Sequence, residues 1–138
     1  MTSGGCACGN LKYTFDGEPA GVALCHCIPC RRSSNSAYSN NLLVPAAAFK
    51  PTGTPKQWSR TGDSGKAVTN SFCPECGTLV WVQGEAMTGV VIVKAGTLAD
   101  LSLVDGKFKP KVEIYCRNKF AWLPDVEGVA KFEGSMSG

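Results

Sequence analysis

The sequence predicts a small, mainly β protein whose fold depends on cysteine motifs. Sixteen glycines and eight prolines among 138 residues indicate many turns, and few apolar residues recur with the spacing of a helix. Several short segments instead alternate between apolar and polar residues, as strands with one buried face do. Eight cysteines fall between these segments in closely spaced groups, a pattern that is typical of metal sites.

The length and composition fit a single globular domain. An apolar fraction of 43% and a charged fraction of 18% are ordinary for such a protein. A chain of 138 residues can bury roughly two-thirds of the surface that its extended form exposes. We therefore expect one domain over residues 1–138, with a core at about 4–122 and a C-terminal tail at about 123–138.

Two strands are predicted in the first quarter of the chain. Leu11, Tyr13 and Phe15 alternate with polar residues, which predicts a strand over residues 11–15. The segment GVALC at 21–25 predicts a second strand, which ends in a group of three cysteines.

Helix is scarce in the predicted structure. Residues 29–35, PCRRSSN, can form one helical turn within that cysteine group and just beyond it. Residues 45–49, PAAAF, can form another, because Pro45 suits the first helical position.

The second half of the chain supplies the remaining predicted strands. Residues 67–72 and 78–82 flank a cysteine pair like the two arms of a hairpin. Residues 89–96 form the most apolar run of the chain, which predicts a buried strand.

The last predicted strand covers residues 111–116, KVEIYC. Val112, Ile114 and Cys116 share one side of this strand, and Glu113 lies on the other. We expect the apolar side to be buried, with Cys116 packing as a small hydrophobic residue.

The charge balance argues against nucleic acid as a partner, and the hydropathy argues against a membrane. Lys and Arg exceed Asp and Glu by 14 to 11, without the basic stripe and aromatic platforms of a nucleic-acid-binding module. No run approaches the roughly 18 apolar residues that span a bilayer, and the first ten residues lack the features of a signal peptide. We expect a cytoplasmic protein, in which cysteines bind metal more often than they form disulfides.

Two cysteine pairs have the spacing of one structural zinc site. Cys6 and Cys8 are two residues apart, so their side chains share a face of an extended segment. Cys73 and Cys76 flank a tight turn that contains Pro74. Two ligands from each pair would complete the tetrahedron of thiolates that zinc prefers. Spacing alone also allows either pair to combine with the central cysteines.

Cys25, Cys27 and Cys30 form a second group, with three ligands rather than four. A zinc ion with three protein ligands keeps an exchangeable position, which is the pattern of a reactive site. His26, the single histidine, lies among them, but strand alternation turns its side chain away, and we expect a supporting or packing role for it. Like His26, Cys116 is a candidate for a fourth ligand. Its place on an apolar strand face argues against that role.

A three-thiolate zinc site favours sulfur chemistry. Its net charge of about −1 makes it acidify water less well than a neutral three-histidine site does. A soft, sulfur-rich zinc is better suited to binding another thiolate. Arg31 and Arg32 follow the group directly, and we expect one of them to bind a carboxylate of the incoming thiol compound.

The cysteine motifs occur in the order CxC, CxCxxC and CxxC, and longer segments accompany them. GGCACGNLKY, CHCIPCRRSSNSAY, FCPECGTLVW and VKAGTL together resemble the glutathione-dependent formaldehyde-activating enzymes, a family that includes the centromere protein V relatives. The resemblance covers residues 4–122. The chain departs from the family pattern at Asn35, where glycine is common, and at Ala99, where an acidic residue is usual.

This resemblance implies a zinc-binding β-tent fold of antiparallel strands and two zinc ions per chain. It implies that Cys25, Cys27 and Cys30 hold a catalytic zinc and that four further cysteines hold a structural one. These four are Cys6, Cys8, Cys73 and Cys76. The implied reaction is that of a carbon–sulfur lyase or synthase, in which the sulfur of the co-substrate glutathione adds to formaldehyde and gives S-hydroxymethylglutathione.

Two hypotheses for function follow. The first is an enzyme that acts on glutathione and formaldehyde, or on a different carbonyl compound or glutathione conjugate. The second is a non-catalytic glutathione carrier or zinc-stabilised binding module, in which both metals are structural. The expected partners are glutathione, as a small-molecule thiol, and a carbonyl compound or conjugate, and the sequence is compatible with an oligomer.

Overall fold

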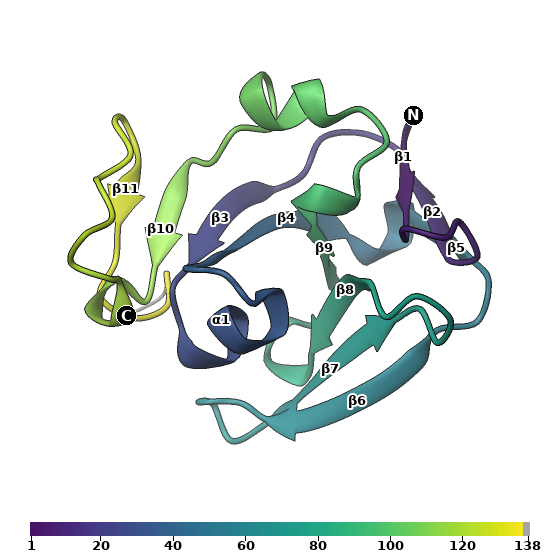
Figure 1. The fold of residues 1–138 in the computed structure, drawn as a ribbon, viewed down its shortest axis with the longest axis horizontal. Helices are drawn as coiled ribbons and strands as arrows, with labels where there is room; N and C mark the ends of the chain where they lie inside the picture. Colours follow the sequence, from purple (N-terminus) through teal and green to yellow (C-terminus); the bar gives the residue numbers. More distant parts are fainter. Residues whose placement is uncertain (137–138) are drawn as a thin grey trace.

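The computed structural model describes residues 1–136, and two β-sheets dominate it (Figure 1). Within these residues the smaller sheet has three strands, in the order β1-β2-β5, and the larger has eight, in the order β11-β10-β3-β4-β9-β8-β7-β6. The strands of the smaller sheet are β1 Thr2–Gly5, β2 Lys12–Phe15 and β5 Phe49–Thr52. The strands of the larger sheet are β3 Gly21–Cys25, β4 Ser39–Pro45, β6 Lys56–Thr61, β7 Ala67–Phe72, β8 Leu79–Gly84, β9 Val90–Lys94, β10 Val112–Ile114 and β11 Ala130–Lys131. The predicted mainly β class is confirmed.

Helical structure is limited to short elements. The described residues contain one α-helix, α1 Ile28–Ser34, which confirms the predicted helical turn at 29–35. The 3-10 turns are η1 Ala46–Ala48, η2 Glu85–Met87, η3 Ala95–Thr97, η4 Leu101–Asp105 and η5 Cys116–Asn118. After α1, Asn35 has the left-handed backbone conformation with φ of 50°, which explains why glycine suits this position and why asparagine is accepted there. No helix of the described residues is long and apolar enough to cross a membrane.

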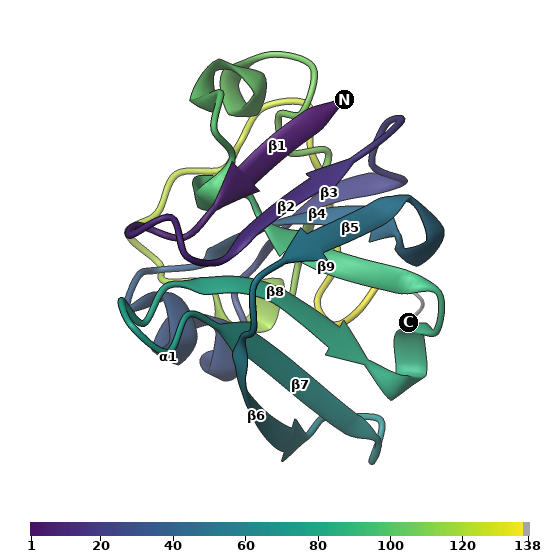
Figure 2. The same ribbon diagram turned by 90° about the vertical axis from the view of Figure 1, so that its right-hand side faces the viewer.

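The hydrophobic core lies where the smaller sheet packs across the larger one. Figure 2 shows β1, β2 and β5 in front of β3, β4 and β9. Leu11, Tyr13 and Phe15 are each only 1% exposed, so the predicted alternation of the first strand is confirmed. Gly4 on β1 has to be a glycine, because a Cβ at this position would collide with the Tyr13 hydroxyl and with the carbonyl of Thr97.

The neighbouring strands are antiparallel except around β10. This strand runs parallel to β3 on one side and to β11 on the other, so the expected antiparallel arrangement holds elsewhere in the sheets but not there. Through β11, the C-terminal segment 123–136 adds a strand to the larger sheet. Residues 137 and 138 of the expected tail lie outside the described residues.

The expectation for the faces of the last predicted strand is wrong. Glu113 is 1% exposed, whereas Val112 and Ile114 are only partly buried. The strand ends at Ile114, and Cys116 begins a 3-10 turn with a partly exposed thiol. Glu113 can be buried because the Nε2 atom of His26 lies 2.9 Å from its Oε1 atom, so the carboxylate is hydrogen-bonded.

Candidate metal centres

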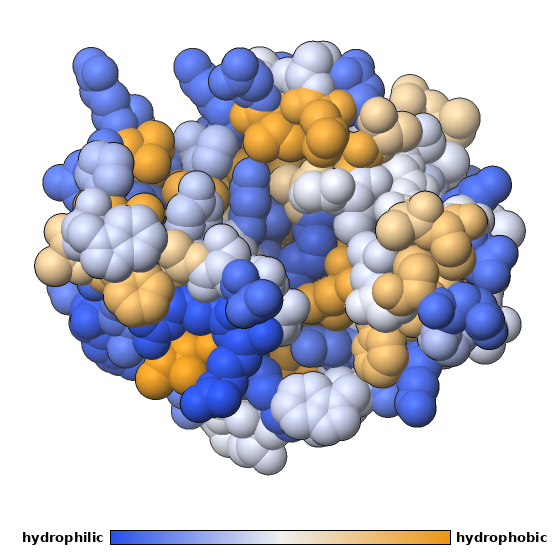
Figure 3. All heavy atoms as spheres, viewed as in Figure 1, coloured by the Kyte–Doolittle hydropathy of each residue, from blue (hydrophilic) through white to orange (hydrophobic). Residues whose placement is uncertain are grey.

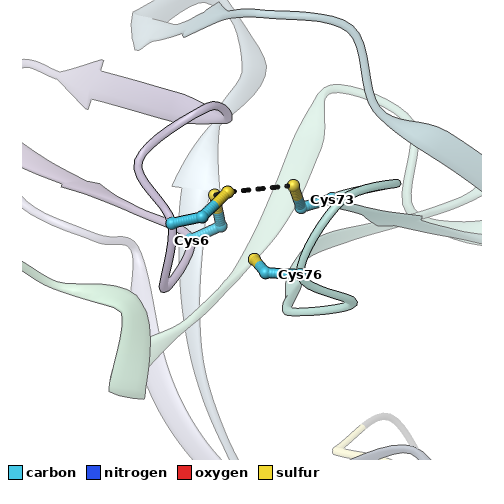
Figure 4. A group of neighbouring side chains, drawn as sticks. Cys6, Cys73 and Cys76 are labelled. Atoms are coloured by element: carbon cyan, nitrogen blue, oxygen red, sulfur yellow. Dashed lines mark hydrogen bonds between the residues drawn. The ribbon is translucent and has the colours of Figure 1, made fainter.

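Four cysteines from two distant hairpins meet at one point, and we call them the four-cysteine cluster. Cys6 and Cys8 lie in the turn between β1 and β2, and Cys73 and Cys76 in the turn between β7 and β8 (Figure 4). The four sulfur atoms lie within 4.8 Å of one another. The Sγ atom of Cys8 is 3.7 Å from the Sγ atoms of both Cys6 and Cys73. The edge of a zinc–thiolate tetrahedron with bonds of about 2.3 Å is about 3.8 Å long, so the donor set fits zinc.

Hydrogen bonds to sulfur prepare this cluster for metal binding. The backbone N–H of Leu11 donates to the Sγ atom of Cys6 over 3.2 Å. Hydrogen bonds from the hydroxyl and backbone of Thr78 lower the pKa of Cys76 to about 5. The hydroxyl of Thr78 also accepts a bond from the backbone N–H of Ala7, which joins the two turns directly. A thiol that ionises easily is a ready metal ligand.

Cys25, Cys27 and Cys30 form a second group, the three-cysteine cluster. Cys25 is the last residue of β3, Cys27 caps the N-terminus of α1, and Cys30 lies within α1. Their sulfur atoms are also within 4.8 Å of one another. Among residues 1–136, no fourth ligand atom of His, Cys, Asp or Glu joins this group. The cluster therefore offers three sulfur donors to a metal.

The pKa values of the three thiols are shifted in different directions. Hydrogen bonds from Cys25 and Cys27 lower the pKa of Cys30 to about 2, and the positive charge of Lys94 adds to the effect. The pKa of Cys25 is raised in return, because this thiol donates to the other two and is buried. The lowered pKa of Cys30 favours its thiolate next to Lys94.

Lys94, at the end of β9, is a residue of this site that the sequence reasoning did not single out. Its Nζ atom donates a 2.6 Å hydrogen bond to the Oδ1 atom of Asn41 on β4. The Nδ2 atom of Asn41 in turn donates to the hydroxyl of Ser39. Burial lowers the pKa of Lys94, although the three cysteines oppose this shift. The available signal was a lysine within the most apolar run of the sequence.

His26 is directed at a carboxylate on β10. Its side chain is 1% exposed, and its Nε2 atom lies 2.9 Å from the Oε1 atom of Glu113. The Nζ atom of Lys119 lies 3.4 Å from the same oxygen. The backbone N–H of His26 donates to the carbonyl of Ile114. These contacts fix the segment between Cys25 and α1 against β10.

The two arginines of α1 have different surroundings. The Nη1 atom of Arg31 donates to the carbonyl of Asn118 over 3.2 Å, and its guanidinium lies 4.6 Å from the ring centre of Phe120. Arg32 is exposed to solvent and lines a hollow beside the helix. Arg32 is therefore better placed than Arg31 to meet a ligand, and ligand binding by either residue stays a prediction.

Two hollows flank α1, on a face of the molecule that is hollowed near its centre (Figure 3). The first, the polar pocket, has a volume of about 300 Å³ and is lined by Ser33, Ser34, Tyr38, Ser39, Asn40, Thr78, Leu79, Lys94, Gly96 and Thr97. The second, the aromatic groove, has a volume of about 450 Å³ and is lined by Ile28, Pro29, Arg32, Ser33, Trp58, Arg60 and Asn70. Ser33 lines both, so both hollows border the helix that carries Cys30.

A mainly β fold with one four-sulfur and one three-sulfur group defines a protein with two candidate zinc centres. Over residues 1–118 the chain matches the sequence model of the family described as glutathione-dependent formaldehyde-activating enzyme, and it belongs to this family. No match to a curated protein is found. The crystal structure of a Rhodobacter sphaeroides protein is similar in fold, with a TM-score of 0.56, 18% sequence identity, and coverage of 70% of this chain and 87% of that chain.

Proposed function

We propose that the chain is a zinc-dependent carbon–sulfur lyase or synthase, which joins the thiol of glutathione to a carbonyl compound. Formaldehyde is the carbonyl compound that the family description names. The observation that supports this proposal most directly is the difference in donor number between the two clusters. Four sulfurs can enclose a metal, whereas the three sulfurs beside α1 leave one position to a ligand from solution.

The donor set of each cluster fits zinc, and we propose two ions per chain. When bound by Cys25, Cys27 and Cys30, zinc would supply a Lewis acid with a free position for a soft ligand such as a thiolate. The remaining work of binding and charge stabilisation falls to the side chains around this cluster.

The polar pocket is suited to the peptide-like body of glutathione. Polar residues that line it include Tyr38, Asn40 and Lys94, and phenol, amide and ammonium groups can form hydrogen bonds with the amides and carboxylates of a peptide. This arrangement would hold the thiol compound with its sulfur near Cys30.

The reaction replaces a thiol S–H bond and a carbonyl π bond with a carbon–sulfur bond and an O–H bond. The glutathione thiol releases its proton to solvent, a sulfur electron pair forms the bond to the carbonyl carbon, and the π electrons move to the carbonyl oxygen, which then takes a proton from solvent. The ammonium of Lys94 has three donors, and Asn41 accepts one of them. We propose that a second donor stabilises the negative charge that develops on the oxygen.

Exchange NMR tests this function. In a mixture of formaldehyde and glutathione, the exchange rate between free and adducted glutathione should increase in proportion to the concentration of protein. A glutathione carrier would change the populations without accelerating the exchange. An exchange rate that is independent of protein concentration would therefore contradict the enzymatic function. Because glutathione is the reduced thiol pool of the cytosol, we also propose a cytoplasmic location.

A further inference from the structure

The aromatic groove lies beside the three-cysteine cluster, yet glutathione addition to formaldehyde does not require it. The groove lies between α1 and the hairpin of β6 and β7, which are neighbours in Figure 1. Its volume of about 450 Å³ exceeds that of the polar pocket, about 300 Å³. Formaldehyde has a single carbon atom and would leave this space unused.

The walls of the groove expose large apolar side chains. Trp58, on the edge strand β6, is 57% exposed, and Ile28, at the start of α1, is 48% exposed. Exposed apolar side chains that line one concave surface are characteristic of ligand sites. An indole offers a flat face on which an aromatic or conjugated group can stack. Glutathione has no group of this kind.

The groove also carries positive charge that no protein group neutralises. Arg32 and Arg60 both line it, and no Asp or Glu does. Within residues 1–136, neither arginine forms an ion pair. Two such guanidinium groups favour a ligand that bears a carboxylate, which arginine can bind with two parallel hydrogen bonds. Asn70 lies opposite Trp58 in the β6–β7 register and adds an amide to the same wall.

The groove borders the three-cysteine cluster. Ile28 and Pro29, which lie between Cys27 and Cys30 in the chain, line its α1 wall. On the same wall, the hydroxyl of Ser33 donates to the carbonyl of Cys30. A ligand in the groove would therefore reach the three-cysteine cluster along α1.

We propose that the aromatic groove binds the electrophile, and that this electrophile is an aromatic or conjugated carbonyl compound bearing a carboxylate. The indole of Trp58 stacks on its flat body, Arg32 and Arg60 bind its carboxylate, and its carbonyl carbon receives the glutathione sulfur. The bonds that form and break are those of the formaldehyde reaction. The role of the ligand as a substrate rests on the proposed function, but its binding does not.

Isothermal titration of the zinc-containing protein with 4-formylbenzoate, in the absence of glutathione, tests this assignment. We expect 4-formylbenzoate to bind about tenfold or more tightly than benzaldehyde, because only the former can form charge-assisted hydrogen bonds between its carboxylate and an arginine. Trp58→Ala and Arg60→Gln should each weaken binding of 4-formylbenzoate about tenfold or more. Both side chains lie on the surface of β6, and far-UV circular dichroism verifies that each variant is folded.

Trp122→Ala provides the matched control, because Trp122 is 73% exposed and stacks on Phe120 outside the groove. This variant should bind 4-formylbenzoate as the unaltered chain does. Equal affinity for the two aldehydes, or unchanged affinity in folded Trp58→Ala and Arg60→Gln variants, would overturn the proposal. Competition by glutathione for the same site would also overturn it, since the groove would then hold the thiol. A negative exchange experiment with formaldehyde would leave these affinities unchanged, so the two proposals can fail separately.

Discussion

The four-cysteine and three-cysteine clusters use the same donor atom in opposite structural contexts. In the first, Cys8 and Cys73 are 65 residues apart in the sequence, and the cluster joins the smaller sheet to the β7–β8 turn. In the second, all three ligands come from residues 25–30, at the end of one strand and the start of one helix. A cross-link between distant segments restricts the unfolded chain far more than a local one does. We therefore expect the four-cysteine cluster to stabilise the fold more than the three-cysteine cluster does, because it connects segments that are far apart in the chain.

The two clusters also differ in the groups that surround their sulfur atoms. Backbone N–H groups and the Thr78 hydroxyl serve the sulfurs of the four-cysteine cluster. The three-cysteine cluster instead has a partly buried lysine, Lys94, and a helix that lines two hollows. The first environment supplies hydrogen bonds to the sulfur atoms, and the second leaves open space beside them.

Of the proposed substitutions, Cys76→Ser should destabilise the fold most. A small effect would contradict a structural role for the four-cysteine cluster. Zinc binding contributes on the order of 10–16 kcal/mol to folding in small zinc domains, which is comparable with a whole domain stability of about 5–15 kcal/mol. We expect loss of one zinc and cooperative loss of the fold, measured by metal analysis and far-UV circular dichroism. Cys116→Ser, a partly exposed thiol outside both clusters, should keep both ions. A Cys76→Ser variant with unchanged thermal unfolding would exclude the structural role.

Cys27→Ser should remove one zinc and all adduct exchange while the domain stays folded. The three-cysteine cluster closes only a short loop, so its loss releases little chain entropy. Metal analysis, circular dichroism and exchange NMR on the same sample measure the three properties. Unfolding of Cys27→Ser together with a folded Cys76→Ser would show that the roles of the two clusters are reversed.

Glu113→Ala tests the contacts that hold the segment of the three-cysteine cluster against β10. The carboxylate is 1% exposed and lies within 4.0 Å of basic groups of His26, Lys119 and Lys131. Removal of one partner from a buried charged group costs about 3–5 kcal/mol, which urea unfolding should show. Glu127→Ala, at an exposed position, should change stability by less than about 0.5 kcal/mol. Equal losses of stability in the two variants would show that the buried contacts of Glu113 do not stabilise this segment.

Lys94→Met tests whether the cation beside the three-cysteine cluster assists the reaction. Loss of a hydrogen bond to a developing charge, about 1.5–3 kcal/mol, should slow adduct exchange about ten- to hundredfold. Methionine preserves most of the apolar volume of the lysine side chain, and both zinc ions should remain. Lys50→Met, at an exposed position on β5, serves as the control. An unchanged exchange rate in Lys94→Met would show that solvent alone stabilises the oxygen.

Tyr13→Phe should have the smallest effect on stability. Tyr13 lies on β2 of the smaller sheet, which the four-cysteine cluster joins to the β7–β8 turn. Burial raises the pKa of Tyr13 from 10.0 to about 12, so folding favours the neutral phenol. This contribution to the free energy of unfolding is fully present below about pH 10 and is lost as the pH rises toward about 12. Tyr13→Phe should therefore lose less stability between about pH 9 and about pH 11 than the unaltered chain. Urea unfolding at both pH values measures the difference, and parallel losses would rule out this linkage.

The sequence predicted the local structure around the cysteines better than it predicted the long-range contacts. The strands at 21–25 and 67–72 and the helical turn at 29–35 were predicted, because alternation and turn residues are visible within a few positions. Strand β6 was not predicted, because nearly all of its residues are exposed and it shows no buried face. Strand β4 was missed because Asn41 and Ser39 interrupt its apolar pattern.

At the candidate site, too, the sequence predicted local groupings better than long-range contacts. The motif spacing and the family resemblance grouped all seven cysteines as the structure brings them together. Lys94, Trp58 and Arg60 were not anticipated, because they reach the site through the order of strands β9, β7 and β6 in the larger sheet. The burial of Glu113 likewise depends on His26, a partner 87 residues away. Period-2 alternation cannot anticipate such a partner, since it treats every carboxylate as a surface group.

Helix α1 contributes no buried residue to the core. Apolar packing therefore does little to fix its position, which depends on polar contacts such as that of Arg31 with the carbonyl of Asn118. A metal ion held by Cys27 and Cys30 would add a further attachment to the helix that lines both hollows. We therefore expect chelation to loosen one wall of each hollow.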